Sequence, residues 1–262
     1  MQSDWGRRAR RTCAVLASVT FAVMAPVAGL ADDDDDDNRV AFETPDNATD
    51  AYKLMIGGQI YDKWWETIGS DEPQGTHPAY PAAGKKSGKD TWRCKECHGW
   101  DYRGAAGAYG SGSHFTGIKG IDGMKGADPA AIAELLRAEP HGYTEAMIPD
   151  AAMAYLAYFV AHGQMDAPPL VDGTKTVEGD AARGAAGYQT VCARCHGMDG
   201  TAMNFGSSDK PEYLGTLAAD NPWEAAHKIR FGQPAAEMPG LIALAPDAVA
   251  DILSYAQTLP TK

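Results

Sequence analysis

The stretches Cys94–His98 (CKECH) and Cys192–His196 (CARCH) decide how this chain of 262 residues folds. Each contains two cysteines separated by two residues, with a histidine directly after the second cysteine and a glycine after that. This pattern is the attachment signature of c-type haem. The two thiols add to the vinyl groups on one edge of the porphyrin, and the neighbouring histidine swings under the ring to bind the iron. We therefore predict two haem c groups, held covalently by Cys94, Cys97, Cys192 and Cys195 and ligated on one face by His98 and His196.

Paired cysteines have two other common uses. In an exported protein they can form disulfides, and two Cys-x-x-Cys pairs can hold one tetrahedral zinc ion. Neither use explains the histidine that follows each pair. The chain has five cysteines, and the fifth, Cys13, lies in a segment that we expect to be removed on export. Haem attachment therefore accounts for every cysteine of the remaining chain.

The first 31 residues have the features of a secretory signal peptide. A basic region with four arginines precedes an apolar stretch over 13–27, and Gly29-Leu30-Ala31 offers the small residues of a cleavage site. The apolar stretch is shorter than the ~20 residues that span a bilayer, although an uncleaved N-terminal anchor is the alternative. We expect cleavage near Ala31, a periplasmic location, no membrane span afterwards, and an acidic disordered tail over 32–50.

The charge of the chain limits its partners. The formal net charge is −12 at pH 7, and removal of the arginine-rich leader makes the remaining chain more acidic still. Such a surface disfavours binding to nucleic acid or to anionic lipid. It favours redox partner proteins with a basic docking face, because attraction between opposite charges steers their encounter.

The two motifs belong to an internal repeat. Pro149-Asp150 opens an amphipathic pattern over 151–158, and Pro246-Asp247 opens a matching pattern over 248–255. The offset of 97 residues is close to the 98 that separate the two motif histidines. Apolar spacing of this kind predicts helices. Strand signals are scarce, and 29 glycines and 16 prolines indicate long loops.

A further helix is expected before each motif, over 52–68 and over 180–190. The sequence thus predicts a mostly α protein with two tandem domains, whose long loops surround the covalently bound haems. We place the N-terminal domain at 51–165, a linker at 166–177 and the C-terminal domain at 178–262.

Each half resembles a class I cytochrome c domain, in which an N-terminal helix, the haem motif, a ligand loop and a C-terminal helix follow in order. The resemblance is close over 178–260. It is looser over 50–165, where an insertion at 69–91 departs from the pattern. The pair of domains is similar to the dihaem cytochromes that serve periplasmic oxidoreductases, and this resemblance implies electron transfer.

The resemblance also indicates the second iron ligands. Glu237-Met238-Pro239-Gly240 resembles the Met-Pro loop of class I cytochromes, so Met238 is the expected distal ligand of the second haem. A shift of 97 residues back along the repeat lands on His141, which we expect to ligate the first haem. Met147 is the alternative, because it lies in the same loop.

The other histidines and the aromatic residues near the motifs carry weaker signals. We expect His77, His162 and His227 to be structural or exposed, and His114 to be a loop residue near the first haem. Three aromatic residues beside the first motif are expected to wall its haem, namely Trp92, Trp100 and Tyr102.

Electron transfer is the predicted function, because two six-coordinate irons leave no open position for a substrate. A haem with His and Met ligands has the higher potential, so electrons would pass from the N-terminal haem to the C-terminal one. The chain can act as a free carrier or as the cytochrome subunit of an oxidoreductase. The competing hypothesis is a dihaem enzyme whose N-terminal haem is open and acts on a peroxide or a sulfur oxyanion.

Overall fold

The computed structural model describes residues 42–166, 168–170 and 174–261, and helices dominate this part of the chain. The predicted signal peptide and most of the predicted acidic tail lie outside the described residues. Within them there are isolated β-bridges but no strand, and no helix combines the length and apolar character needed to span a membrane. The helices are α1 (Asp50–Ile68), α2 (Cys94–His98), α3 (Pro129–Arg137), α4 (Asp150–His162), α5 (Ala181–Gly187), α6 (Ala193–His196), α7 (Leu214–Asp220), α8 (Pro222–Phe231) and α9 (Pro246–Ala256).

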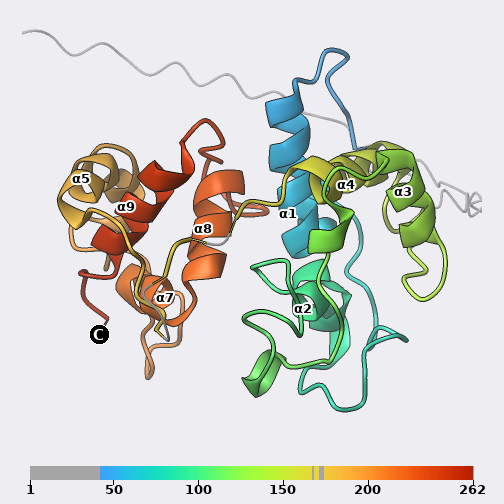
Figure 1. Cartoon of the computed structure of the whole chain (residues 1–262), viewed down its shortest axis with the longest axis horizontal. Helices are drawn as coiled ribbons and strands as arrows, with labels where there is room; N and C mark the ends of the chain where they lie inside the picture. The colour runs from blue at the N-terminus through green and yellow to red at the C-terminus, as the bar shows by residue number, and fades with distance from the viewer. Residues whose placement is uncertain (1–41, 167, 171–173, 262) are drawn as a thin grey trace, which may run out of the picture. The chain divides into compact units, whose positions relative to one another are not determined.

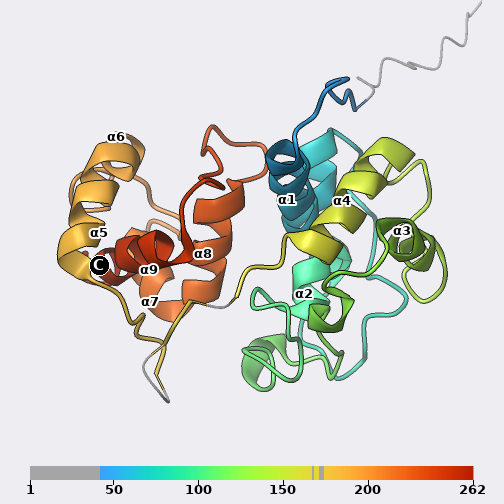
Figure 2. The same ribbon diagram turned by 45° about the horizontal axis from the view of Figure 1, so that its top comes forward.

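Helices α1 and α4 form the frame of the N-terminal half (Figures 1 and 2). Thr49 caps α1, because its hydroxyl accepts a hydrogen bond from the backbone N–H of Tyr52 at 3.2 Å. The two helices approach so closely that a Cβ atom on Gly57 would lie 2.2 Å from the backbone oxygen of Tyr155. Large aromatic and aliphatic side chains fill the core beside this crossing.

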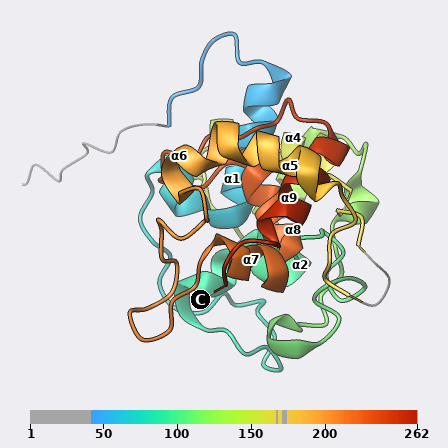
Figure 3. The same cartoon turned by 90° about the vertical axis from the view of Figure 1, so that its left-hand side faces the viewer.

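The C-terminal half repeats this arrangement with α5 and α9 (Figures 1 and 3). Asp180 caps α5 by accepting hydrogen bonds from two backbone N–H groups of its first turn. A Cβ atom on Gly184 would lie 1.9 Å from the backbone oxygen of Asp251, so this crossing also depends on glycine. Arg183 of α5 donates to the Asp251 carboxylate of α9 at 2.8 Å.

The helices expected over 52–68, 151–158, 180–190 and 248–255 are all present, as α1, α4, α5 and α9. The expected helix at 180–190 continues further, because a single π-helical turn over Tyr188–Cys192 joins α5 to α6. The fold is therefore mostly helical as predicted, with a second helical region before the C-terminal one. The other helices α3, α7 and α8 were not predicted from the sequence.

Candidate haem sites

The first motif forms the short helix α2, and its histidine is oriented by a backbone oxygen. Nδ1 of His98 lies 2.8 Å from the carbonyl oxygen of Lys119. Because a carbonyl oxygen can only accept, Nδ1 carries the proton and Nε2 keeps the lone pair that binds a metal. Burial lowers the pKa of His98, so the ring is neutral at pH 7, as ligation requires.

The structure brings the ring of His141 close to that of His98. Their ring centroids are 6.1 Å apart, and their planes differ by 33°. Because a metal–imidazole bond is about 2 Å long, two rings on opposite faces of one iron have centroids roughly 6 Å apart. Nδ1 of His141 contacts the carbonyl oxygen of Leu135 at 3.3 Å, which leaves Nε2 free. The separation of the two rings is thus compatible with a shared iron, and ligation of the first haem by His98 and His141 stays a prediction.

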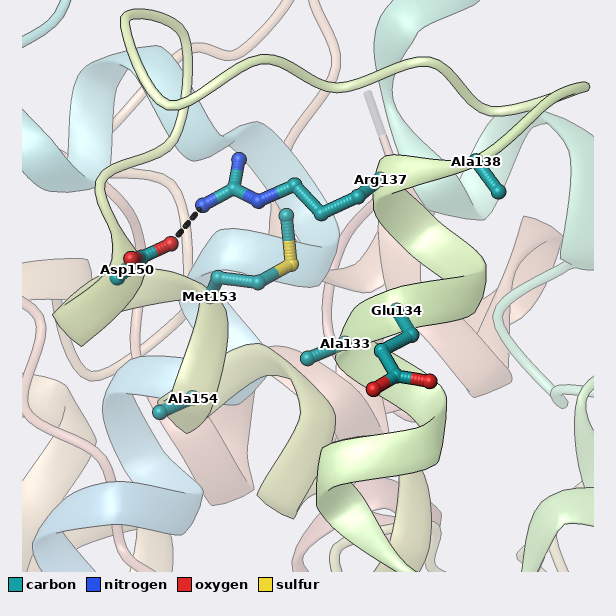
Figure 4. A pocket seen from close by; sticks show the side chains of 7 residues that line it. All are labelled: Ala133, Glu134, Arg137, Ala138, Asp150, Met153 and Ala154. Atoms are coloured by element: carbon teal, nitrogen blue, oxygen red, sulfur yellow. Dashed lines mark hydrogen bonds and ion pairs between the residues drawn. The ribbon is translucent and has the colours of Figure 1, made fainter.

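An arginine at the end of α3 closes the loop that carries His141. Arg137 donates to the carbonyl oxygen of Tyr143 at 3.1 Å and to the carboxylate of Asp150, the first residue of α4, at 2.6 Å. Figure 4 shows this ion pair beside an open hollow between α3 and α4. The hollow is lined by three alanines, Met153, the Glu134 side chain and this ion pair. The role of Arg137 is to join the two ends of the loop that carries His141.

Met147, the alternative ligand, lies at the edge of the N-terminal core. Its half-buried side chain packs against that core, and its carbonyl oxygen accepts a hydrogen bond from Ser70 at 3.1 Å. The ring of His141 lies near that of His98, and the choice between His141 and Met147 as the ligand stays a prediction.

The second motif begins at Cys192, the last residue of the π-helical turn, and continues over α6. Nδ1 of His196 is buried and has no hydrogen-bond partner within the described residues, unlike Nδ1 of His98. The ring of Phe205 is its neighbour, with centroids 6.0 Å apart. Burial lowers the pKa of His196 as well, so this ring is also neutral at pH 7.

A tyrosine fixes the end of each motif helix in the same way. Tyr61 of α1 donates to the carbonyl oxygen of Gly99 at 2.6 Å, and Tyr188 donates to that of Gly197 at 2.8 Å. The two glycines have nearly equal backbone angles, with φ of 81° and 79° and ψ of 161° and 160°. The repeat therefore extends to the local structure around each motif. Neither tyrosine belongs to a sequence motif, although both lie in the helix predicted before each haem motif.

The surface around the second motif fits a porphyrin. Four large apolar side chains between 191 and 205 are 42–60% exposed, namely Val191, Met198, Met203 and Phe205. Apolar groups clustered in this way normally need cover, and a haem held by Cys192 and Cys195 would supply it. Within the described residues there is no group of three or more His, Cys, Asp or Glu side chains that could hold a metal ion.

Met238 lies in the loop between α8 and α9 and is half-buried. Its carbonyl oxygen accepts from the backbone N–H of Gln233 at 3.4 Å. This loop follows α8 and precedes α9, which is the order that the resemblance to cytochromes requires. The approach of its sulfur to the second iron stays a prediction.

The aromatic side chains that follow the first motif, Trp100 and Tyr102, pack against His227 of α8. Tyr102 forms a hydrogen bond of 2.8 Å to Nδ1 of the fully buried His227, whose Nε2 lies 2.9 Å from the carbonyl oxygen of Gly58. The ring of Trp100 lies 4.9 Å from that of His227. His227 is thus a structural residue that joins the two halves, one of the roles expected for it.

Comparison with known proteins identifies the C-terminal half. Residues 179–255 match the family described as cytochrome c oxidase, cbb3-type, subunit III. This segment is a cytochrome c domain, so it binds a haem c through Cys192 and Cys195, and haem-based electron transfer follows. No curated protein matches the chain.

Proposed function

We propose that this chain is an exported dihaem cytochrome c that passes electrons between redox partner proteins in the periplasm. The observation that carries the proposal is the pair of facing imidazoles, His98 and His141, whose rings are 6.1 Å apart. A second iron site outside the matched domain needs such a pair. The shared geometry after each motif, where Tyr61 and Tyr188 hold equivalent glycines, supports a haem in each half.

The ligands we propose are His98 and His141 for the first haem and His196 and Met238 for the second. When bound, each iron supplies a one-electron couple between its ferric and ferrous states. The chain's own residues hold the ligands, exclude water and leave no open coordination position. A thioether ligand raises the potential relative to a second imidazole, so we propose that electrons enter at the first haem and leave from the second.

The partners we propose are proteins with a basic face. The acidic composition supports this choice, because opposite charges accelerate encounter at low salt. The family matched by residues 179–255 is named for an oxidase subunit. We therefore propose that this chain works beside, or as a subunit of, a larger oxidoreductase.

A titration of the purified full chain under carbon monoxide tests the proposal. We expect two low-spin haems that do not react with the gas during the titration and that are reduced at separate potentials. In the His141→Ala variant the first iron should become high-spin and bind carbon monoxide almost completely, because one of its two imidazoles is gone. Absorption spectra with and without the gas measure both outcomes.

The matched control for that variant is Met147→Ala, which removes the alternative ligand. It should leave both haems low-spin. If one haem of the wild-type protein binds carbon monoxide within the time of the titration, the electron-carrier proposal is wrong and an open catalytic iron takes its place. If only Met147→Ala opens the first iron, the ligand assignment is wrong.

The Met238→Ala variant should lose the weak far-red absorption band of a Met–iron bond and lower the potential of the second haem alone. The reason is that a soft thioether stabilises the ferrous form more than a water molecule or a second imidazole does. Met203→Ala is the control, since Met203 is an exposed methionine near the same motif. A band that survives in Met238→Ala but disappears in Met203→Ala would reassign the ligand.

A further inference from the structure

The insertion at 69–91 distinguishes the N-terminal half from the C-terminal one, and nothing above gives it a role. It folds back onto the loop that carries His141. Ser70 donates to the carbonyl oxygen of Met147 at 3.1 Å, and Nε2 of His77 lies 3.0 Å from the carbonyl oxygen of His141. The insertion therefore holds the backbone of the proposed ligand loop at two points.

The imidazole of His77 is fixed in one orientation and one tautomer. Its Nδ1 accepts a hydrogen bond from the backbone N–H of Ala79 at 3.0 Å, so the proton must be on Nε2, which donates to His141. The ring packs against Trp92, with centroids 4.3 Å apart. The backbone N–H of His77 donates to the hydroxyl of Thr91 at 2.8 Å. With the residue only 8% exposed, the ring cannot turn without breaking both of its hydrogen bonds.

His77 supplies the long-range contact that fixes the backbone of His141. The two other hydrogen bonds given for His141 within the described residues are local, since its backbone N–H donates to Ala138 at 3.0 Å and its Nδ1 contacts Leu135. Both of these partners lie at the end of α3, within six residues of His141. His77 lies 64 residues away along the chain. The N–H of the same peptide group, that of Gly142, also donates to Ala138, at 3.0 Å. His77 is therefore the contact that ties this peptide group to the insertion, and without it the hydrogen bonds given for the described residues hold the group only to the end of α3.

We infer that His77 is a positioning residue, which holds the His141 imidazole at its angle to His98 and keeps it bound to the first iron. This inference rests on the proposed function, because it takes His141 as the distal ligand. In this view the insertion stabilises the distal histidine of the first haem. The second half has no such insertion, and its proposed distal ligand comes from the loop that carries Met238.

The test uses the full-length protein with both haems bound and the variant His77→Phe. Phenylalanine keeps a ring against Trp92 but cannot donate to the His141 carbonyl. We expect the low-spin electron paramagnetic resonance signal of the first haem to shift, because that signal depends on the angle between the two imidazole planes. Slow carbon monoxide uptake, which is limited by detachment of His141, should become roughly tenfold faster, as expected for the loss of one buried hydrogen bond. The signal of the second haem should not change.

Three further variants complete the experiment. His77→Gln should restore most of the wild-type signal, because its amide can donate to the same carbonyl. His162→Phe, at an exposed histidine on the end of α4, is the matched control and should change neither haem. Thr91→Val loosens His77 without altering the ligand loop, and it should shift the same signal by a smaller amount even if His77→Phe fails to fold.

The outcomes separate this inference from the proposal on which it rests. If His141→Ala opens the first iron while His77→Phe and Thr91→Val leave its signal and its gas uptake unchanged, the positioning role of His77 is overturned and the ligand assignment stands. If His141→Ala leaves the first haem low-spin and inert, the ligand assignment itself fails.

Discussion

Replacing Cys192 and Cys195 with alanine should remove one covalently bound haem from the protein and leave the other in place. Each haem c depends on two thioether bonds, and the second Cys-x-x-Cys pair makes both bonds of the C-terminal haem. The haem content per polypeptide, measured as the alkaline pyridine complex, should fall by half. The mass of the denatured chain should fall by one haem. The apolar side chains at 191–205 would then lose their cover, so this half should also become sensitive to proteolysis.

Two matched variants make this measurement decisive. The Cys94→Ala/Cys97→Ala variant should lose the other haem and show the same halved content. Cys13→Ala should leave the content unchanged, because that cysteine lies in the predicted leader. A wild-type protein with a single haem would refute the dihaem proposal while leaving the C-terminal cytochrome c domain intact.

The parts of this fold that were predictable are those encoded locally. Helical periodicity and Pro-Asp starts located α4 and α9, and the helices expected before the motifs are α1 and α5. The offset of the repeat singled out His141, and the structure places its ring opposite His98. In each case the signal lies within one segment, or in a register that two segments share.

The contacts that the sequence could not predict join segments far apart along the chain. Tyr102 and His227 are 125 residues apart, and His77 and His141 are 64 apart. Their side chains show no periodicity and no motif, so each reads as an ordinary loop or helix residue. The insertion at 69–91 appeared only as a departure from the cytochrome pattern, although it contacts the proposed ligand loop. Such pairs become visible only when the helices are packed.

A buried cluster of charges is the strongest of these long-range contacts. Asp62 of α1 forms ion pairs with Arg93, just before the first motif, and with Lys228 of α8. The carboxylate is 1% exposed, and both cations are 14% exposed. Burial alone would raise the pKa of Asp62, but Lys228 and Arg93 outweigh it and lower that pKa to about 2. Asp62 therefore pairs with two buried cations and links the two halves, while the exposed carboxylate of Asp90 also lies 3.9 Å from Arg93.

The Asp62→Asn variant should destabilise the protein by about 3–5 kcal/mol, because the loss of one partner leaves buried charges uncompensated. The cost is large because Arg93 and Lys228 would both remain buried without an anion between them. Denaturant unfolding of the haem-bound protein at pH 7 measures the change. We also expect the α1–α8 contact to loosen first, so that hydrogen exchange at α8 increases more than at α9.

The control is Asp166→Asn, which removes a carboxylate that pairs with Lys125 but is 95% exposed. An exposed pair contributes roughly 0–1 kcal/mol, so this variant should unfold almost like the wild type.

The pH dependence of the stability gives a second check. The folded-state pKa of Asp62, about 2, lies below the value of about 3.9 expected in the unfolded chain. Its ionisation therefore contributes its full stability above about pH 4 and loses it as the pH falls toward 2. The free-energy difference between the wild type and Asp62→Asn should be constant near neutral pH and shrink over this acid range. A difference that stays constant down to pH 2 would mean that the carboxylate charge does not hold the two halves together.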